Sequence, residues 1–361
     1  MVLKKFVKLF VVFFLFSCNE QTNYNLYSIS GNALGTKFNI IYTSTSPLQG
    51  LTNLTDSIFV EINNSLSTYM ETSDISKINK GFDFIKVDHH FINVFNKSKV
   101  IWKSTDGFFD PTIGLLTKAY GLGPKHNIQS SVNIDDLMRF TGFEKVSLNN
   151  NMVIKESKEI FLDFNAIAKG YCVDVISRML KKNNITNHLV EIGGEMVASG
   201  KNQVTDAFWR VGITDPLNTS TNNFINRIEL RNKALASSGN YRKFLIDKES
   251  GKKIVHTINP KTGDAFETNI LGSSVIADDC ITADAYATSF MAMPIKKSKE
   301  GFIGLNRKEQ ERVLNELSIA HSYKDKELNL WEKYEAYFDK KNKLKQKMEG
   351  GHTMMKIKLR D

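Results

Sequence analysis

The clearest chemical pair in the sequence is Asp284 and Thr288, which stand in the run DAYAT at 284–288. A helix would place these two side chains one turn apart on the same face. A carboxylate and a hydroxyl so arranged are suitable ligands for a hard cation such as Mg²⁺, which phosphoryl chemistry uses to neutralise charge on phosphate oxygens. An acidic residue near a helix start followed by a threonine is also a common structural pattern, so the pair alone leaves both interpretations open.

Two further segments have the composition of anion-binding sites. The run DFNAIAKG at 163–170 places a polar turn before a helix, where backbone N–H groups attract anions and Lys169 could contact a phosphate. The run EIGGE at 191–195 contains Gly193 and Gly194, which would let the backbone approach a ligand closely. Helix capping in the first run and a β-bulge in the second explain the same residues without a ligand.

Two polar turns could hold or activate groups of the same ligand. The run ASSGNY at 236–241 follows a predicted strand, and its hydroxyls could bind phosphate or ribose. His256 precedes the rigid turn of the run HTINP at 256–260 and could act as a general base or hold a leaving phosphate. A plain turn and a structural histidine are the alternatives at these two places.

Hydrophobic periodicity indicates the elements that must position these segments. Helices are predicted over 51–65, 73–79, 91–105, 134–141, 166–180, 283–293 and 308–317. Strands are predicted as a pair within 27–43, as a hairpin over 146–161, and over 188–199, 208–213, 226–235, 244–246, 254–258, 272–276, 319–323 and 334–338. Helices and strands are mixed without strict βαβ alternation and without a repeat, so the sequence predicts an α+β fold.

The composition is that of a globular protein with a sizeable core. Hydrophobic residues make up 41% and charged residues 24% of the 361 residues, and the formal net charge is +9. Much of the excess charge lies near the N-terminus and in the Lys-rich segment 340–347. No nucleic-acid-binding motif accompanies it, so nucleic acid is not expected as a partner. The cysteines are too few for a disulfide scaffold, and pairing of Cys172 with Cys280 is left open.

The run MVLKKFVKLFVVFFLFSC at 1–18 has the order of a secretory signal. Lysines precede an apolar run that is too short to span a bilayer, and a small residue then precedes Cys18. This ending resembles a bacterial lipobox, whose cysteine receives lipid; an ordinary signal or a buried strand is the alternative. We therefore expect a lipoprotein signal with a lipidated Cys18, a tether over 19–26, one domain over 27–339 and a Lys-rich tail over 340–361. The expected location is the cell membrane of a bacterium, on the periplasmic side of the inner membrane.

Taken in chain order, these segments resemble the ApbE family, the FAD:protein FMN transferases. The resemblance runs from about Gly31 to about Met293. The matching strings are ALGT at 33–36, STY at 67–69, GFFDPT at 107–112, AIAKGY at 166–171, VD at 173–174, IGGE at 192–195, ITDP at 213–216, SSGNY at 237–241, HTINPKTG at 256–263, and ADA and AT within 283–288. Each string is common by itself, but all of them in family order form a specific signal.

The resemblance implies an α+β fold related to the T-fold, with mixed or antiparallel sheets, flanking helices and FAD in a cleft between lobes. It implies Mg²⁺ bound by the side chains of Asp284 and Thr288 and by the carbonyl of Ala166. Tyr69 resembles the residue that contacts the flavin, and His256 the histidine near the scissile phosphates. The FAD-lining positions that it implies are Leu34, Tyr69, Asp110, Lys169, Gly193, Gly194, Ser238, Tyr241 and His256. Leu34 stands where the family usually has methionine, and Asn259 where many members have aspartate.

The activity implied by the resemblance is Mg²⁺-dependent transfer of FMN from FAD to a Ser or Thr hydroxyl of an exported or membrane redox protein. A phosphoester bond would form and AMP would leave, with His256 deprotonating the hydroxyl or steadying the phosphate. Two alternatives use the same residues. One is a Mg²⁺-dependent FAD pyrophosphatase with water as the acceptor, and the other is a flavin-binding lipoprotein that leaves FAD intact.

Overall fold

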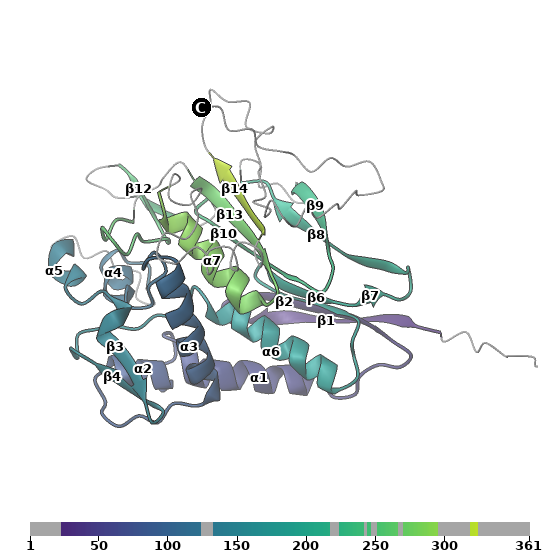
Figure 1. The fold of residues 1–361 in the computed structure, drawn as a ribbon. Coiled ribbons are helices and arrows are strands. Elements are labelled where there is room, and N and C mark those ends of the chain that lie inside the picture. The colour runs from purple at the N-terminus through teal and green to yellow at the C-terminus, as the bar shows by residue number, and fades with distance from the viewer. Residues whose placement is uncertain are drawn as a thin grey trace, which may run out of the picture.

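A seven-stranded antiparallel sheet lies at the centre of the fold (Figure 1). The structure, a computed structural model, describes residues 23–123, 133–216, 224–241, 244–246, 251–265, 270–294 and 318–323. The strands, in sheet order, are β1 Asn25–Ala33, β2 Thr36–Ser44, β5 His188–Ile192, β6 Glu195–Ser199, β10 Ala234–Gly239, β13 Ile270–Ala277 and β14 Ser318–Tyr323.

Four helices cover one face of this sheet. They are α1 Leu51–Leu66, α3 His89–Ser104, α6 Ala168–Lys182 and α7 Cys280–Ala292. The helix α6 packs against β5 and β6, whereas α7 packs against β10 and β13 and also against α6, and Figure 1 shows the two helices side by side in front of the sheet. The main hydrophobic core fills the space between the helices and the sheet, because each helix turns an apolar stripe inward.

The helix α7 is buried on almost every side, unlike the amphipathic helices around it. Alternating small residues, Ala283, Ala285 and Ala287, let it fit between the sheet and its neighbours, and all three are fully buried. Asp279 caps its N-terminus by accepting a hydrogen bond from the N–H of Thr282 at 3.0 Å. Any polar side chain on such a helix must find a partner or a ligand inside the protein.

Smaller units surround the sheet and its helices. A three-stranded ribbon of β7 Lys201–Asn202, β8 Ala207–Thr214 and β9 Phe224–Leu230 packs with residues of the sheet strands β6 and β10 around Trp209, Val211 and Leu230. A third apolar cluster joins α4 to β12 through Leu116 and Ile254. The remaining elements are α2 Asp74–Asn79, α4 Gly114–Ala119, α5 Ile134–Met138, a 3₁₀ turn Phe143–Lys145, β3 Val146–Asn149, β4 Met152–Lys155, β11 Phe244–Ile246 and β12 Lys253–Val255.

The α+β class predicted from the sequence is confirmed, and most predicted elements are present with shifted ends. The strand predicted over 226–235 is wrong, because the chain turns at Asn232, whose φ of 53° is left-handed, and splits it into β9 and β10. The helix α7 begins three residues before the predicted start, where Asp279 caps it. The helix α4 was not predicted, and the range 19–26 expected as a tether ends inside β1. The predicted elements over 308–317 and 334–338 lie outside the described residues.

The closest approach of α6 to α7 occurs at Gly170. A Cβ atom at this position would lie 2.4 Å from the carbonyl oxygen of Cys280 and 2.7 Å from Cβ of Asp284. Glycine is therefore required here by space, and the two helix backbones come into direct contact.

Replacing Gly170 with Ala is expected to lower the free energy of unfolding by about 1–3 kcal/mol, because the helices must separate. The sign of the change in unfolding free energy is informative, since Ala is a better helix former than Gly by about 1 kcal/mol and would stabilise an isolated helix. Urea unfolding followed by circular dichroism measures the change. The control is Gly123→Ala, whose added Cβ would make an ordinary 3.7 Å contact with Lys118 and should change stability by less than about 0.5 kcal/mol. Equal losses in the two variants would contradict the close contact.

Candidate active site

Asp284 of α7 forms a hydrogen bond with the first turn of α6. Its side chain is buried, and Oδ2 accepts a hydrogen bond from the N–H of Gly170 at 2.9 Å. This N–H belongs to the first turn of α6, where no carbonyl of the helix itself can reach it. Among the described residues no hydrogen bond reaches the carbonyl oxygen of Ala166 or Oδ1 of Asp284. Two oxygen ligands are therefore left available where the two helices meet.

Thr288 lies one turn further along α7 and faces β10. Its Oγ1 is 3.0 Å from Oγ of Ser238, and either hydroxyl can be the donor. The structure therefore joins two residues that the sequence predicted for one site, one as a metal ligand and the other as part of the FAD-lining set.

Lys169 connects α6 to the strand β6 through an ion pair. Its Nζ lies 2.7 Å from Oε1 of Glu195, which is 3% exposed. Burial alone would lower the pKa of Lys169, but the carboxylates of Asp284 and Glu195 outweigh burial and hold that pKa above its ordinary value. Lys169 is therefore a charged counter-ion to two buried carboxylates.

Glu195 is a site residue to which the sequence analysis gave no role. Burial raises the pKa of its carboxyl, Lys169 opposes this effect and Asp284 adds to it. Its Oε2 is buried and has no hydrogen-bond partner among the described residues. The sequence signal that could have identified it is a glutamate directly after paired glycines, followed by the apolar residues Met196, Val197 and Ala198 of the same strand.

The two glycines before Glu195 form the turn between β5 and β6, which lies beside the β1–β2 turn. Gly193 has a φ of 64°, its N–H donates to the carbonyl of Lys37 at 3.0 Å, and a Cβ there would lie 2.8 Å from Cγ2 of Thr36. The turn itself contains Leu34, which has a left-handed φ of 50° and packs against the core. Leu34, Gly193 and Gly194 are thus brought together, as the resemblance implies.

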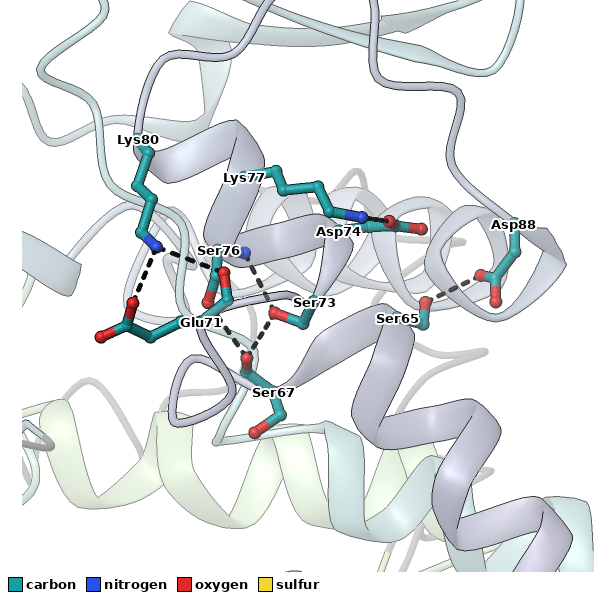
Figure 2. A network of polar contacts seen from close by, with 9 residues as sticks. All are labelled: Ser65, Ser67, Glu71, Ser73, Asp74, Ser76, Lys77, Lys80 and Asp88. Carbon is teal, nitrogen blue, oxygen red and sulfur yellow. Dashed lines mark hydrogen bonds and ion pairs between the residues drawn. The ribbon is translucent and has the colours of Figure 1, made fainter.

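Tyr69 stands between Ser67 and Glu71 in the sequence, and Figure 2 shows the polar network that those two residues form. The carbonyl of Ser67 accepts hydrogen bonds from the hydroxyls of Ser73, at 2.6 Å, and Ser76, at 3.2 Å. Lys80 forms an ion pair with Glu71 at 3.2 Å on the far side of the same turn. The network fixes the backbone on both sides of Tyr69 and leaves its side chain 59% exposed.

The Tyr69 turn borders the segment that leads into α6. Asn165 Nδ2 donates to Oγ1 of Thr68 at 3.4 Å. Partial burial and then the charge of Asp163 raise the pKa of Tyr69. The aromatic ring and the carbonyl of Ala166 therefore belong to adjoining parts of the surface.

Asp110 is bound by the fold itself, and its predicted FAD-lining role stays a prediction. Its buried carboxylate accepts hydrogen bonds from the N–H and the hydroxyl of Thr112, from the indole N–H of Trp102 and from the N–H of Phe143. These four bonds use the acceptor capacity of the two oxygens. The next residue, Pro111, accepts a hydrogen bond from the N–H of Asp163 at 2.7 Å, so Asp110 supports the site from behind.

His256 and Tyr241 lie on two segments joined by a side-chain hydrogen bond. Thr257 Oγ1 donates to Oδ1 of Asn240 at 2.9 Å, which fixes the loop after β12 to the end of β10. His256 is exposed on that loop. A Cβ at Gly239 would lie 2.5 Å from the ring of Tyr241, so this ring folds back over the end of β10. The roles predicted for His256 and Tyr241 stay predictions.

A second cluster of metal-ligand residue types, Asp88, His89 and His90, has its atoms within 4.8 Å of one another. The ring nitrogens of His90 lie 3.0 Å from the hydroxyl of Tyr171 and 3.2 Å from Glu61. Asp88 Oδ1 caps α3 at Phe91 N and accepts from Ser65 Oγ, a contact visible in Figure 2. These bonds hold α1, α3 and α6 together, and we interpret the cluster as structural.

A shallow cavity of about 270 Å³ lies elsewhere, between the β1–β2 pair and the start of α1, and Tyr27, Tyr42 and Leu51 line part of it. It contains none of the predicted site residues, and we do not assign FAD to it. The FAD cleft between lobes stays a prediction.

Cys172 and Cys280 are both buried free thiols, so the question of their pairing is settled against a disulfide. Cys18 lies outside the described residues, within which no helix has the length and apolar character needed to cross a bilayer.

Comparisons with known proteins show which family and fold the chain resembles. The model of the ApbE family matches residues 34–308, a range that includes every predicted site residue of the domain. A FAD:protein FMN transferase of Haemophilus influenzae is 29% identical over 300 residues, which are 79% of this chain and 85% of that protein. One of Vibrio cholerae is 29% identical over 273 residues, 73% of this chain and 80% of that protein. The solved structure of the flavin transferase ApbE from Vibrio cholerae superposes with a TM-score of 0.71 at 26% identity, over 84% of this chain and 95% of that chain.

Replacing Lys169 with Met is expected to lower the free energy of unfolding by about 3 kcal/mol near pH 8, because two buried carboxylates lose their cation. The loss should shrink toward about pH 5. Glu195 has a folded-state pKa above its unfolded value, so it takes up a proton there and the missing partner matters less. Urea unfolding at both pH values measures the effect.

The matched control for this variant is Lys77→Met, which removes the lysine of a surface pair with Asp74 at 3.2 Å. This change should cost less than about 1 kcal/mol at either pH. The assignment of Lys169 as the counter-ion of two buried carboxylates would be contradicted by either of two results. Lys169→Met could lose no more unfolding free energy than the control, or its loss could grow as the pH falls.

Proposed function

Because the chain belongs to the ApbE family, we propose that it is a FAD:protein FMN transferase, which moves the FMN half of FAD to a hydroxyl of another protein. The observation that carries the proposal is the contact between α6 and α7. It places the carboxylate of Asp284, the unpaired carbonyl of Ala166 and the ammonium group of Lys169 on neighbouring turns of two packed helices. Transfer of a phosphoryl-linked group requires this combination of oxygen ligands and positive charge.

Mg²⁺ is the metal that we propose for this site. The available donors are all oxygens, from the carboxylate of Asp284, the carbonyl of Ala166 and the hydroxyl of Thr288, and hard cations prefer such ligands. The remaining Asp284 oxygen and the Ala166 carbonyl have no hydrogen-bond partner among the described residues, so binding there displaces no internal bond. When bound, Mg²⁺ would neutralise negative charge on the pyrophosphate oxygens of FAD.

The residues of the chain supply binding and orientation. The ammonium group of Lys169 would hold the pyrophosphate, and Tyr69 would pack against the flavin ring. The backbone of Gly193 and Gly194 lets the substrate approach the sheet closely. Fixing FAD and the acceptor in line removes much of the entropic barrier to the reaction.

His256 is proposed to accept the proton of the attacking Ser or Thr hydroxyl, or to steady the phosphate. The hydroxyl oxygen bonds to the phosphorus on the FMN side, and the bond from that phosphorus to the bridging oxygen breaks. AMP leaves with that oxygen, and FMN remains on the acceptor through a phosphoester bond. The exposure of His256 is consistent with this role, because the acceptor must reach it from outside.

We propose that the acceptor is an exported or membrane redox protein and that Cys18 anchors the enzyme by lipid on the periplasmic side of the inner membrane. The support is the sequence of residues 1–18, with its lysines, apolar run and small residue before cysteine. Enzyme and acceptor would then share one compartment.

The transfer reaction is tested with the chain from residue 19 onward, FAD, Mg²⁺ and a flavin-acceptor domain. The acceptor is expected to gain the mass of one FMN, and EDTA should prevent the gain. A version of the acceptor with its Ser or Thr replaced by Ala is the control and should stay unmodified. FMN and AMP released beside an unmodified acceptor would instead support the pyrophosphatase, and intact FAD with a panel of acceptors would support a binding protein.

Replacing Asp284 with Asn is expected to reduce transfer by at least about 100-fold, because the amide still accepts the hydrogen bond of Gly170 but lacks the charge that binds a cation. The far-ultraviolet circular dichroism spectrum should be unchanged. The matched control is Ser289→Ala, which removes another buried polar group of α7, bonded to the carbonyl of Ala285 at 2.7 Å, and should stay within about twofold of the wild type. Wild-type transfer rates in Asp284→Asn would rule out the metal assignment.

A further inference from the structure

A buried carboxylate of α6 binds the N-terminus of α7. Asp174 is 6% exposed, and its Oδ1 and Oδ2 accept hydrogen bonds from the N–H groups of Cys280 and Ile281, both at 2.9 Å. These N–H groups belong to the first turn of α7, where no carbonyl of the helix itself can reach them. Asp174 therefore acts as a cap that is supplied by a different helix.

The two helices are joined in both directions. Asp174 of α6 accepts from the backbone of α7, and Asp284 of α7 accepts from the backbone of α6 at Gly170. Gly170 and Asp174 are four residues apart, so they lie on the same face of α6, one turn from each other. Together the two contacts fix both the position of α7 along its axis and its rotation.

We infer that Asp174 is a positioning residue for the proposed metal site, which keeps Asp284 and Thr288 of α7 opposite the carbonyl of Ala166 at the start of α6. The inference rests on the proposed function, because that function assigns the metal to these ligands. Without Asp174, α7 keeps its own cap, Asp279, but loses the bonds that tie its start to α6. A small shift along the helix axis then separates ligands that stand on different helices.

A carboxylate is required at this position because both of its oxygens accept. Each bond is charge-assisted, and the negative charge lies at the positive end of the α7 dipole. An asparagine of the same shape has one accepting oxygen and would direct its NH₂ group at the second backbone N–H. The variant Asp174→Asn thus removes the paired hydrogen bonds to Cys280 and Ile281 with little change of side-chain volume.

The experiment measures metal binding directly, with Mn²⁺ as the probe and electron paramagnetic resonance of free Mn²⁺ as the readout, in the chain from residue 19 onward without FAD. Asp174→Asn is expected to raise the Kd for Mn²⁺ at least about tenfold. The control is Asp279→Asn, which removes the negative charge of the other residue that caps this helix end, and its ion pair with Lys97, without touching α6, and it should change the Kd less than about twofold. Thermal unfolding of both variants shows whether they lose similar stability.

A Kd in Asp174→Asn equal to that of the wild type, or equal increases in both variants, would overturn the positioning role. If Asp174→Asn does not fold, Asp174→Glu provides a second test, because its carboxylate keeps two accepting oxygens while the added CH₂ group changes their position, and its Kd should rise by a smaller factor. Failure of the proposed metal site is distinguishable, since the wild type would then bind no Mn²⁺ or Asp284→Asn would bind it unchanged. Excess Mg²⁺ should restore FMN transfer in Asp174→Asn, whereas a variant that is merely unfolded would stay inactive.

Discussion

The direct contact between α6 and α7 at Gly170 is the constraint on which the site depends. Because no side chain separates the helices there, the N–H of Gly170 reaches the carboxylate of Asp284 and not the carbonyl of Ala166. This hydrogen bond orients the carboxylate of Asp284 toward the start of α6, where the carbonyl of Ala166 also has no hydrogen-bond partner among the described residues. The small residues of α7 also make this contact possible, because they let a helix that carries polar residues pack inside the core.

Charge explains why Lys169 and Glu195 accompany this contact. A buried carboxylate is costly unless a cation or several donors compensate it, and the site holds two, Asp284 and Glu195. Lys169 is shared between them, and its own pKa is held high by both. Apolar residues of similar volume would cost less, so a set of charges at this place is better explained by a charged substrate and a cation than by stability.

The sequence predicted the proposed metal ligands but not the residues that surround them. Asp284 and Thr288 follow from helical spacing, and the motif strings identified Lys169 and the paired glycines. The supporting contacts could not be predicted, because their partners are far apart in the sequence. Asp174 binds the N–H of Cys280, which is 106 residues away, and Glu195 forms an ion pair with Lys169 of another element. No local sequence pattern indicates such contacts. Helix α7 was placed three residues late because its first turn is capped by Asp279 and by Asp174, and not marked by an apolar stripe. The split of one predicted strand at Asn232 likewise depends on a single left-handed residue.

The use of acceptor oxygens separates the structural carboxylates of this protein from the reactive ones. Asp110 accepts four hydrogen bonds and Asp174 gives both oxygens to the backbone, so each is occupied by the fold itself. Asp284 uses one oxygen and retains the other, and Glu195 buries an oxygen without a partner among the described residues. The histidine cluster at the start of α3 belongs with the first group, since both ring nitrogens of His90 are occupied. The unused oxygens of Asp284 and Glu195 therefore belong to the two carboxylates that share Lys169, which is where an added cation and an anionic substrate would complete the charge balance.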